Sequence, residues 1–75
     1  MWIIKISDGE VSTETTLENM TKEEAETKLS EVGNLYYKKL QKRGENPSIS
    51  KEKTKVSVYR VTQMKTTTFE LKWKI

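Results

Sequence analysis

One long amphipathic segment organises this sequence: MTKEEAETKLSEVGNLYYKKLQKRG, residues 20–44. At about 100° per residue, its apolar side chains fall on one narrow stripe. The stripe consists of Ala25, Leu29, Val32, Tyr36 and Leu40. The pattern predicts a helix over residues 22–43 that buries this stripe against the rest of the protein.

The ends of this helix carry the expected signals. Thr21 followed by Glu24 matches a capping box, and Gly44 stands where a helix commonly ends in a left-handed residue. Acidic residues fill the first turns and basic residues the last, as the helix dipole favours. Gly33 leaves two interpretations: a continuous helix that lies close to its neighbour, or a break. We favour continuity, because the apolar stripe stays in phase beyond Gly33.

A hairpin is predicted before the helix. Residues 2–7 alternate as a strand that presents Trp2, Ile4 and Ile6 on one face. Asp8-Gly9 is a strong turn signal, and the Thr-rich residues 10–17 then suit a charged edge strand. If residues 10–17 were a loop instead, the fold would be a three-stranded βαββ layer.

A second hairpin is predicted after the helix. Residues 44–53 are polar, contain a proline and a glycine, and are predicted to be a connection. Residues 63–66 suit a turn, and residues 67–75 alternate cleanly as the last strand. The apolar face of that strand consists of Phe69, Leu71, Trp73 and Ile75.

The strand predicted over residues 53–62 has an ambiguous orientation. Val56 and Val58 share one face, while Tyr59 and Val61 share the other. Either the strand bulges or both of its faces are partly covered.

Hairpin, helix and hairpin together predict one α+β domain over residues 1–75, with the helix packed across a four-stranded sheet. A crossover through the helix would make the first and last strands parallel neighbours, giving a mixed sheet in a two-layer, β-grasp-like ββαββ fold. This element order is similar to that of ubiquitin-like modules and of the immunoglobulin-binding domains of streptococcal surface proteins. The expected core consists of Trp2, Ile4, Ile6, Leu29, Val32, Tyr36, Leu40, Phe69, Leu71 and Trp73.

The composition argues against catalysis. The 75 residues are 33% hydrophobic and 33% charged, and they include no cysteine and no histidine. Disulfides, Cys/His metal sites and Cys- or His-dependent nucleophiles are therefore excluded. No apolar run approaches the roughly 20 residues of a membrane span. We expect a cytoplasmic protein that is not an enzyme, does not contact a membrane and uses no cofactor or metal.

The charge distribution raises the possibility of an anionic partner. Residues 1–37 carry three lysines against eight acidic residues, whereas residues 38–75 carry eleven basic and three acidic ones. On the predicted sheet, the face away from the helix presents basic side chains and one aromatic, which is typical of platforms for single-stranded nucleic acid. These candidates are Lys5, Lys55, Lys72 and Lys74, together with either Tyr59 or Arg60, depending on the orientation of the strand over residues 53–62. A lysine-rich, solvated face is the ordinary alternative, and Glu70 lies in its middle.

Some apolar residues exceed what one core can bury. Leu35 and Tyr37 flank the helix stripe, and Met64 lies in a predicted turn, so they are candidates for a protein interface or a homodimer. We therefore expect a small intracellular protein-interaction module, such as an accessory or inhibitor protein of a phage or mobile element. The alternative is a small nucleic-acid-binding protein that uses the basic sheet face.

Overall fold

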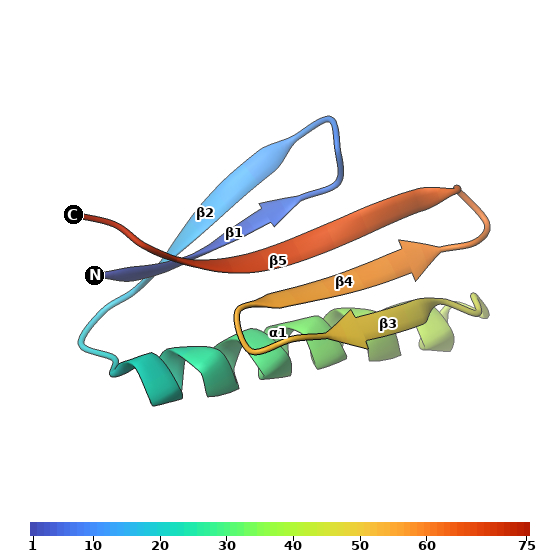
Figure 1. The fold of residues 1–75 in the computed structure, drawn as a ribbon. Coiled ribbons are helices and arrows are strands. Elements are labelled where there is room, and N and C mark those ends of the chain that lie inside the picture. Colours follow the sequence, from blue (N-terminus) through green and yellow to red (C-terminus); the bar gives the residue numbers. More distant parts are fainter.

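A computed structural model describes all residues, 1–75, as one helix lying on one face of a five-stranded antiparallel sheet (Figure 1). In chain order the elements are β1 (Trp2–Ser7), β2 (Ser12–Leu17), α1 (Lys22–Lys42), β3 (Ser48–Lys51), β4 (Lys55–Arg60) and β5 (Lys65–Trp73). Across the sheet the order is β2-β1-β5-β4-β3. The predicted α+β class and the predicted strand over residues 10–17 are confirmed.

The predicted four-stranded mixed sheet is wrong, because the connection after the helix contains β3. This strand pairs antiparallel with β4 and forms the second edge of the sheet. An additional strand between the helix and the last hairpin reverses the direction in which β5 runs. As a result β5 lies antiparallel to β1, with Ile4 opposite Leu71, and the β-grasp layout is not confirmed.

The predicted helix is confirmed, and its two ends have the expected caps. Thr21 Oγ1 accepts a hydrogen bond from the Glu24 amide at 3.2 Å, and the Glu24 carboxylate accepts one from the Thr21 amide at 2.9 Å. At the other end, Gly44 has a φ of 86°. The amides of Gly44 and Glu45 donate to the carbonyls of Gln41 and Leu40, which is the Schellman arrangement.

The predicted turn at Asp8-Gly9 is also confirmed. One carboxylate oxygen of Asp8 accepts hydrogen bonds from the amides of Val11 and Glu10, at 2.9 and 3.0 Å, and Gly9 has a φ of 95°. These bonds, that from Val11 first, lower the pKa of the Asp8 carboxyl. The second predicted turn lies two residues earlier than expected, where the Met64 amide donates to the Val61 carbonyl.

Gly33 allows the helix to lie very close to the sheet. A Cβ atom added at Gly33 would lie 2.6 Å from Cγ1 of Val56 and 3.2 Å from its Cβ. Val56 is β-branched and fully buried, so it has little freedom to move aside. The continuous helix is therefore confirmed, and its interior glycine has a packing reason.

The core lies between α1 and the sheet and resolves the orientation of β4. Val56 and Val58 face the helix and are buried, whereas Tyr59 and Val61 are exposed. Trp73 was expected in the core but is 59% exposed, because β4 begins opposite Glu70 and the last residues of β5 pair only with β1. The buried cluster consists of Ile4, Leu17, Ala25, Leu29, Leu40, Val56, Val58, Phe69 and Leu71.

No helix of the structure combines the length and the apolar character needed to cross a membrane.

Replacing Gly33 with alanine should destabilise the fold even though alanine is the better helix former. The helix propensity gain is about 1 kcal/mol, whereas overpacking a filled core costs roughly 1–3 kcal/mol. We expect a lower urea midpoint for Gly33→Ala. In a double-mutant cycle, Gly33→Ala should cost less in a Val56→Ala background, and an equal cost in both backgrounds would contradict the close contact.

Candidate interaction surfaces

The sheet face opposite the helix carries a row of alternating charges. The strand registers place Glu14 of β2 opposite Lys5 of β1, Lys5 opposite Glu70 of β5, and Glu70 opposite Lys55 of β4. Each lysine in this row therefore has a carboxylate on at least one side. Opposite charges at directly paired positions attract, so the row is favourable as it stands.

Two further lysines of this face are paired with the same glutamates. Lys72 Nζ lies 3.6 Å from Glu70 Oε1, and Lys74 Nζ lies 3.1 Å from Glu14 Oε1. The Lys74–Glu14 pair spans β1. Ile3 of β1 lies midway between the positions that these two residues occupy along the sheet. Ile3 belongs to this outer face by alternation, yet it is only 4% exposed. Ile3 is thus buried on the face that the helix does not cover.

The structure thus brings Lys5, Lys55, Lys72 and Lys74 to one face, as predicted, but interleaves them with Glu14 and Glu70. Tyr59 lies on the same face and is 38% exposed. A phosphate backbone following this surface would meet carboxylates as well as ammonium groups. Four lysines and two glutamates leave a smaller positive charge than the lysines alone suggest.

Much of the remaining outer face is lined by small hydroxyl side chains. One row of the register crosses all five strands through serine and threonine only: Ser12, Ser7, Thr68, Ser57 and Ser50. Beside it a shallow hollow of about 310 Å³ is lined by Lys5, Ser7, Gly9, Thr66, Thr68 and Glu70. These short polar groups leave the face open without forming an apolar patch.

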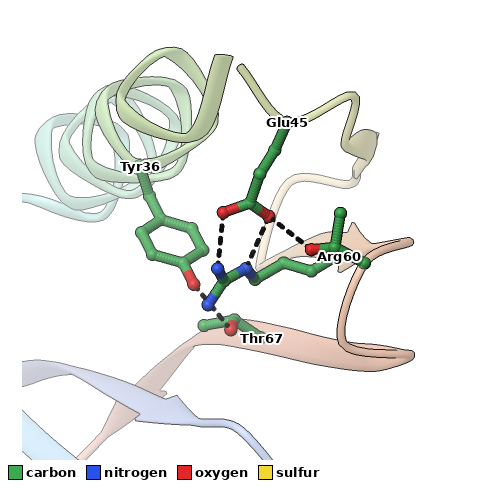
Figure 2. A network of polar contacts seen from close by, with 5 residues as sticks. Tyr36, Glu45, Arg60 and Thr67 are labelled. Carbon is green, nitrogen blue, oxygen red and sulfur yellow. Dashed lines mark hydrogen bonds and ion pairs between the residues drawn. The ribbon is translucent and has the colours of Figure 1, made fainter. Parts of the chain in front are cut away.

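Arg60 lies on the other side of the sheet from the lysines. It faces the helix side with Val56 and Val58, where it forms a bidentate ion pair with Glu45 (Figure 2). Both side chains are largely shielded, at 16% and 14% exposure for Arg60 and Glu45. Arg60 therefore does not lie on the predicted nucleic-acid face. Because of the orientation of β4, Tyr59 lies there instead.

This polar network follows from the helix C-terminus. The Schellman turn directs Glu45 toward the start of the β4–β5 connection, where Arg60 Nε donates to its Oε1 at 3.0 Å and Thr62 Oγ1 donates to the same oxygen at 3.1 Å. Next to it, Thr67 Oγ1 donates to the Tyr36 hydroxyl at 3.3 Å, as Figure 2 shows. The hydrogen bond from Arg60 is the main cause that lowers the pKa of Glu45, and the same bond raises the pKa of Arg60.

The three residues predicted for a protein interface do not form one patch. Leu35 is 68% exposed, whereas Tyr37 packs against the core on nearly the opposite side of the helix. Met64 is 80% exposed in the β4–β5 turn. Toward the C-terminus of the helix Leu35 lies beside Lys38, Lys39 and Lys42, and toward the N-terminus it lies beside Glu31 and Asn34.

A different apolar surface lies where the two ends of the chain meet, and we call it the aromatic end: Met1, Trp2, Trp73 and Ile75. The rings of Trp2 and Trp73 pack edge to face with their centroids 5.0 Å apart. The amide of Lys74 donates to the carbonyl of Met1 at 2.7 Å, which holds the two termini together. Besides Trp73, Met1 is 54% exposed and Ile75 is fully exposed.

The sequence pattern concealed the aromatic end because alternation assigns Trp73 to the buried face. The face is correct, but burial also needs a neighbouring strand and a covering helix. Only the register shows that β4 pairs with β5 no further than Glu70, so that Trp73 has a strand beside it on the β1 side alone.

No group of three or more metal-ligating side chains lies together in the structure. The sequence matches no protein-family model, and comparison with curated proteins and with solved structures gives no match.

The Glu45–Arg60 pair should make stability depend on pH. Because folding lowers the pKa of Glu45, its contribution is present above the unfolded pKa of about 4.5 and is lost as the pH falls through the lower folded pKa. We expect the urea midpoint of the wild type to fall more steeply than that of Glu45→Gln between about pH 6 and about pH 3. The exposed Glu31→Gln should behave as the wild type, and parallel curves for all three proteins would contradict the pairing.

Proposed function

We propose that this protein is a non-enzymatic protein-interaction module that engages its partner through the aromatic end. The single observation that carries the proposal is Trp73, an indole 59% exposed that is held against Trp2. Tryptophan is among the residues that most often dominate the binding energy of protein interfaces. Here its orientation is fixed before binding, so little conformational entropy is lost when a partner covers it.

The surroundings of Trp73 favour a protein partner with an apolar pocket. Met1 and Ile75 extend the exposed apolar surface on either side of the tryptophan pair. Lys72 and Lys74 lie on the other face of the same end of the sheet, where each is paired with a glutamate, and these pairs add polar surface beside the apolar one. Apolar centres surrounded by polar contacts are the usual arrangement of specific interfaces.

Several features support a binding role over catalysis. The sequence has no cysteine or histidine, and Glu23 and Glu24 sit in the first turn of α1, where the helix dipole accounts for them. The hollows on the surface are shallow and open. As part of the same proposal, the small size and lysine-rich composition suit a cytoplasmic accessory or inhibitor protein of a phage or mobile element.

Nucleic-acid binding by the outer sheet face is the alternative proposal. Tyr59 and the four lysines favour it, because stacking and phosphate attraction together bind single strands. The ion pairs of Lys72 with Glu70 and of Lys74 with Glu14 weigh against it. Each of those pairs would have to be exchanged for a phosphate contact.

Substitution of Trp73 tests the proposal. Wild-type protein, Trp73→Ala and the matched surface control Tyr59→Ala would each be used to capture partners from a lysate of the native cells. We expect the wild type and Tyr59→Ala to retain the same partner, and Trp73→Ala to lose at least about tenfold in affinity in a titration. Since Trp73 is mostly exposed, circular dichroism should show all three folded.

Nucleic-acid binding would be tested alongside the partner capture. Fluorescence anisotropy with labelled single-stranded and duplex DNA at low salt should give no binding by the wild type. Binding that falls steeply with salt and is weakened by Lys72→Glu and Lys74→Glu would replace the protein partner with nucleic acid. Equal capture of the partner by wild type and Trp73→Ala would reject the aromatic end.

A further inference from the structure

The two edges of the sheet differ in how well they are protected against pairing. At one edge, β3 has only four residues, follows the buried Pro47 and ends in the exposed Lys51. At the other edge, β2 has six residues, STETTL, of which five are exposed and none is lysine, proline or glycine. Short strands, prolines and charged side chains, lysine above all, prevent edge pairing. The β2 edge has neither proline nor lysine, and its one charged residue, Glu14, is already paired with Lys74.

The hydrogen-bond alternation shows which β2 groups are free. The Asp8 amide donates to the Val11 carbonyl, so Asp8 and Val11 are a hydrogen-bonded pair at the end of the β1–β2 ladder. Alternation from this pair makes Thr13, Thr15 and Leu17 bond to β1. The N–H and C=O groups of the other residues point away from the sheet: Ser12, Glu14 and Thr16.

Both faces beside this edge are open. The helix packs chiefly against β4 and β5, and in Figure 1 the β1–β2 hairpin projects away from it. Thr13 and Thr15 lie on the helix side of the sheet and are nevertheless exposed. On the outer side, Glu14 is neutralised by Lys74. Neither a side chain nor the helix stands in the way of an added strand.

The sequence of β2 can pair with itself in one favourable register. In an antiparallel pair the two-fold axis can pass through Thr13, Glu14 or Thr15. An axis through Glu14 puts two carboxylates directly opposite each other, and an axis through Thr13 overlaps only three residues of the strand. An axis through Thr15 overlaps residues 13–17 and sets each Glu14 opposite Thr16.

We propose that two copies of this chain associate through their β2 strands, antiparallel and centred on Thr15, into one continuous sheet. The free groups of Glu14 and Thr16 then form about four hydrogen bonds with those of the second copy. Like charges are not opposed, and both helices lie on the same side of the joined sheet, apart from each other. Val11, 64% exposed, lies beside the end of the second copy's strand.

The second copy is favoured over an unrelated strand because its β2 meets every requirement at once. The β2 strand of the second copy has the same uncovered faces and the same unprotected edge. In the register centred on Thr15, no charged residue lies opposite a like charge. The contact involves about five residues of each copy, fewer than the roughly 20–30 a side of a stable interface, so we expect a dimer that dissociates in the micromolar range or weaker. The contact uses the free edge of β2 and not the exposed Trp73, so this inference goes beyond the proposed function.

Proline at Thr16 tests the pairing without disturbing the β1–β2 ladder. It removes an N–H that points outward, and the matched control Lys51→Pro should do the same at the protected β3 edge. Sedimentation equilibrium from about 5 to about 500 µM should show the wild type and Lys51→Pro rising toward twice the chain mass. Thr16→Pro should stay at the mass of one chain, with an unchanged circular dichroism spectrum.

A second variant keeps the test informative if Thr16→Pro does not fold. Thr15→Lys keeps the backbone and places two ammonium groups opposite each other at the axis, so it should weaken the dimer at least about tenfold at low salt and less at high salt. A wild type that is monomeric at every concentration would overturn the inference, as would a dimer that neither β2 variant affects. Trp73→Ala should leave the dimer unchanged, so failure here and failure of the proposed function are distinguishable.

Discussion

The antiparallel pairing of β1 with β5 is the contact on which the rest of the sheet depends. These are the first and last strands of the chain, and their register runs from Trp2 opposite Trp73 to Ser7 opposite Thr68. Every other strand adds outward from this pair, β2 on one side and β4 then β3 on the other. The helix carries the chain from one edge of the sheet to the other. Both edges and both candidate surfaces follow from this arrangement.

The pairing also brings charges from the acidic and the basic halves of the sequence next to each other. The acidic first half of the chain and the basic second half meet side by side at β1 and β5. Glu14 thereby reaches Lys74, and Lys5 lies opposite Glu70. Part of the charge difference along the sequence therefore becomes local ion pairs between the two halves, Lys74 with Glu14 and Lys65 with Glu10.

Local signals in the sequence predicted most of the local structure. The capping box at Thr21, the turn at Asp8-Gly9 and the glycine at position 44 all act within a few residues, so one sequence suffices to identify them. The strand β3 has a single apolar residue, Ile49, and gave no pattern to find. Missing it reversed the expected direction of β5, because strand direction depends on the number of strands that precede it.

The candidate surfaces were less accessible to sequence reasoning. Alternation correctly gathered Lys5, Lys72 and Lys74 on one face, but the partners of these lysines come from other strands and need the register. Trp73 was predicted on the correct face of the sheet, but it was expected to be buried and is mostly exposed. The openness of β2 is likewise a property of its neighbours, since the same residues inside a sheet would be paired on both sides.

The direction of the central pair can be measured directly by two-dimensional NMR. In an antiparallel sheet the α protons of pairs that are not hydrogen-bonded to each other lie close together. We therefore predict α-proton to α-proton NOEs between Ile4 and Leu71 and between Ile6 and Phe69. A parallel β1–β5 pair would lack both of these NOEs, and that result would contradict the β1–β5 register and the charge pairing that depends on it.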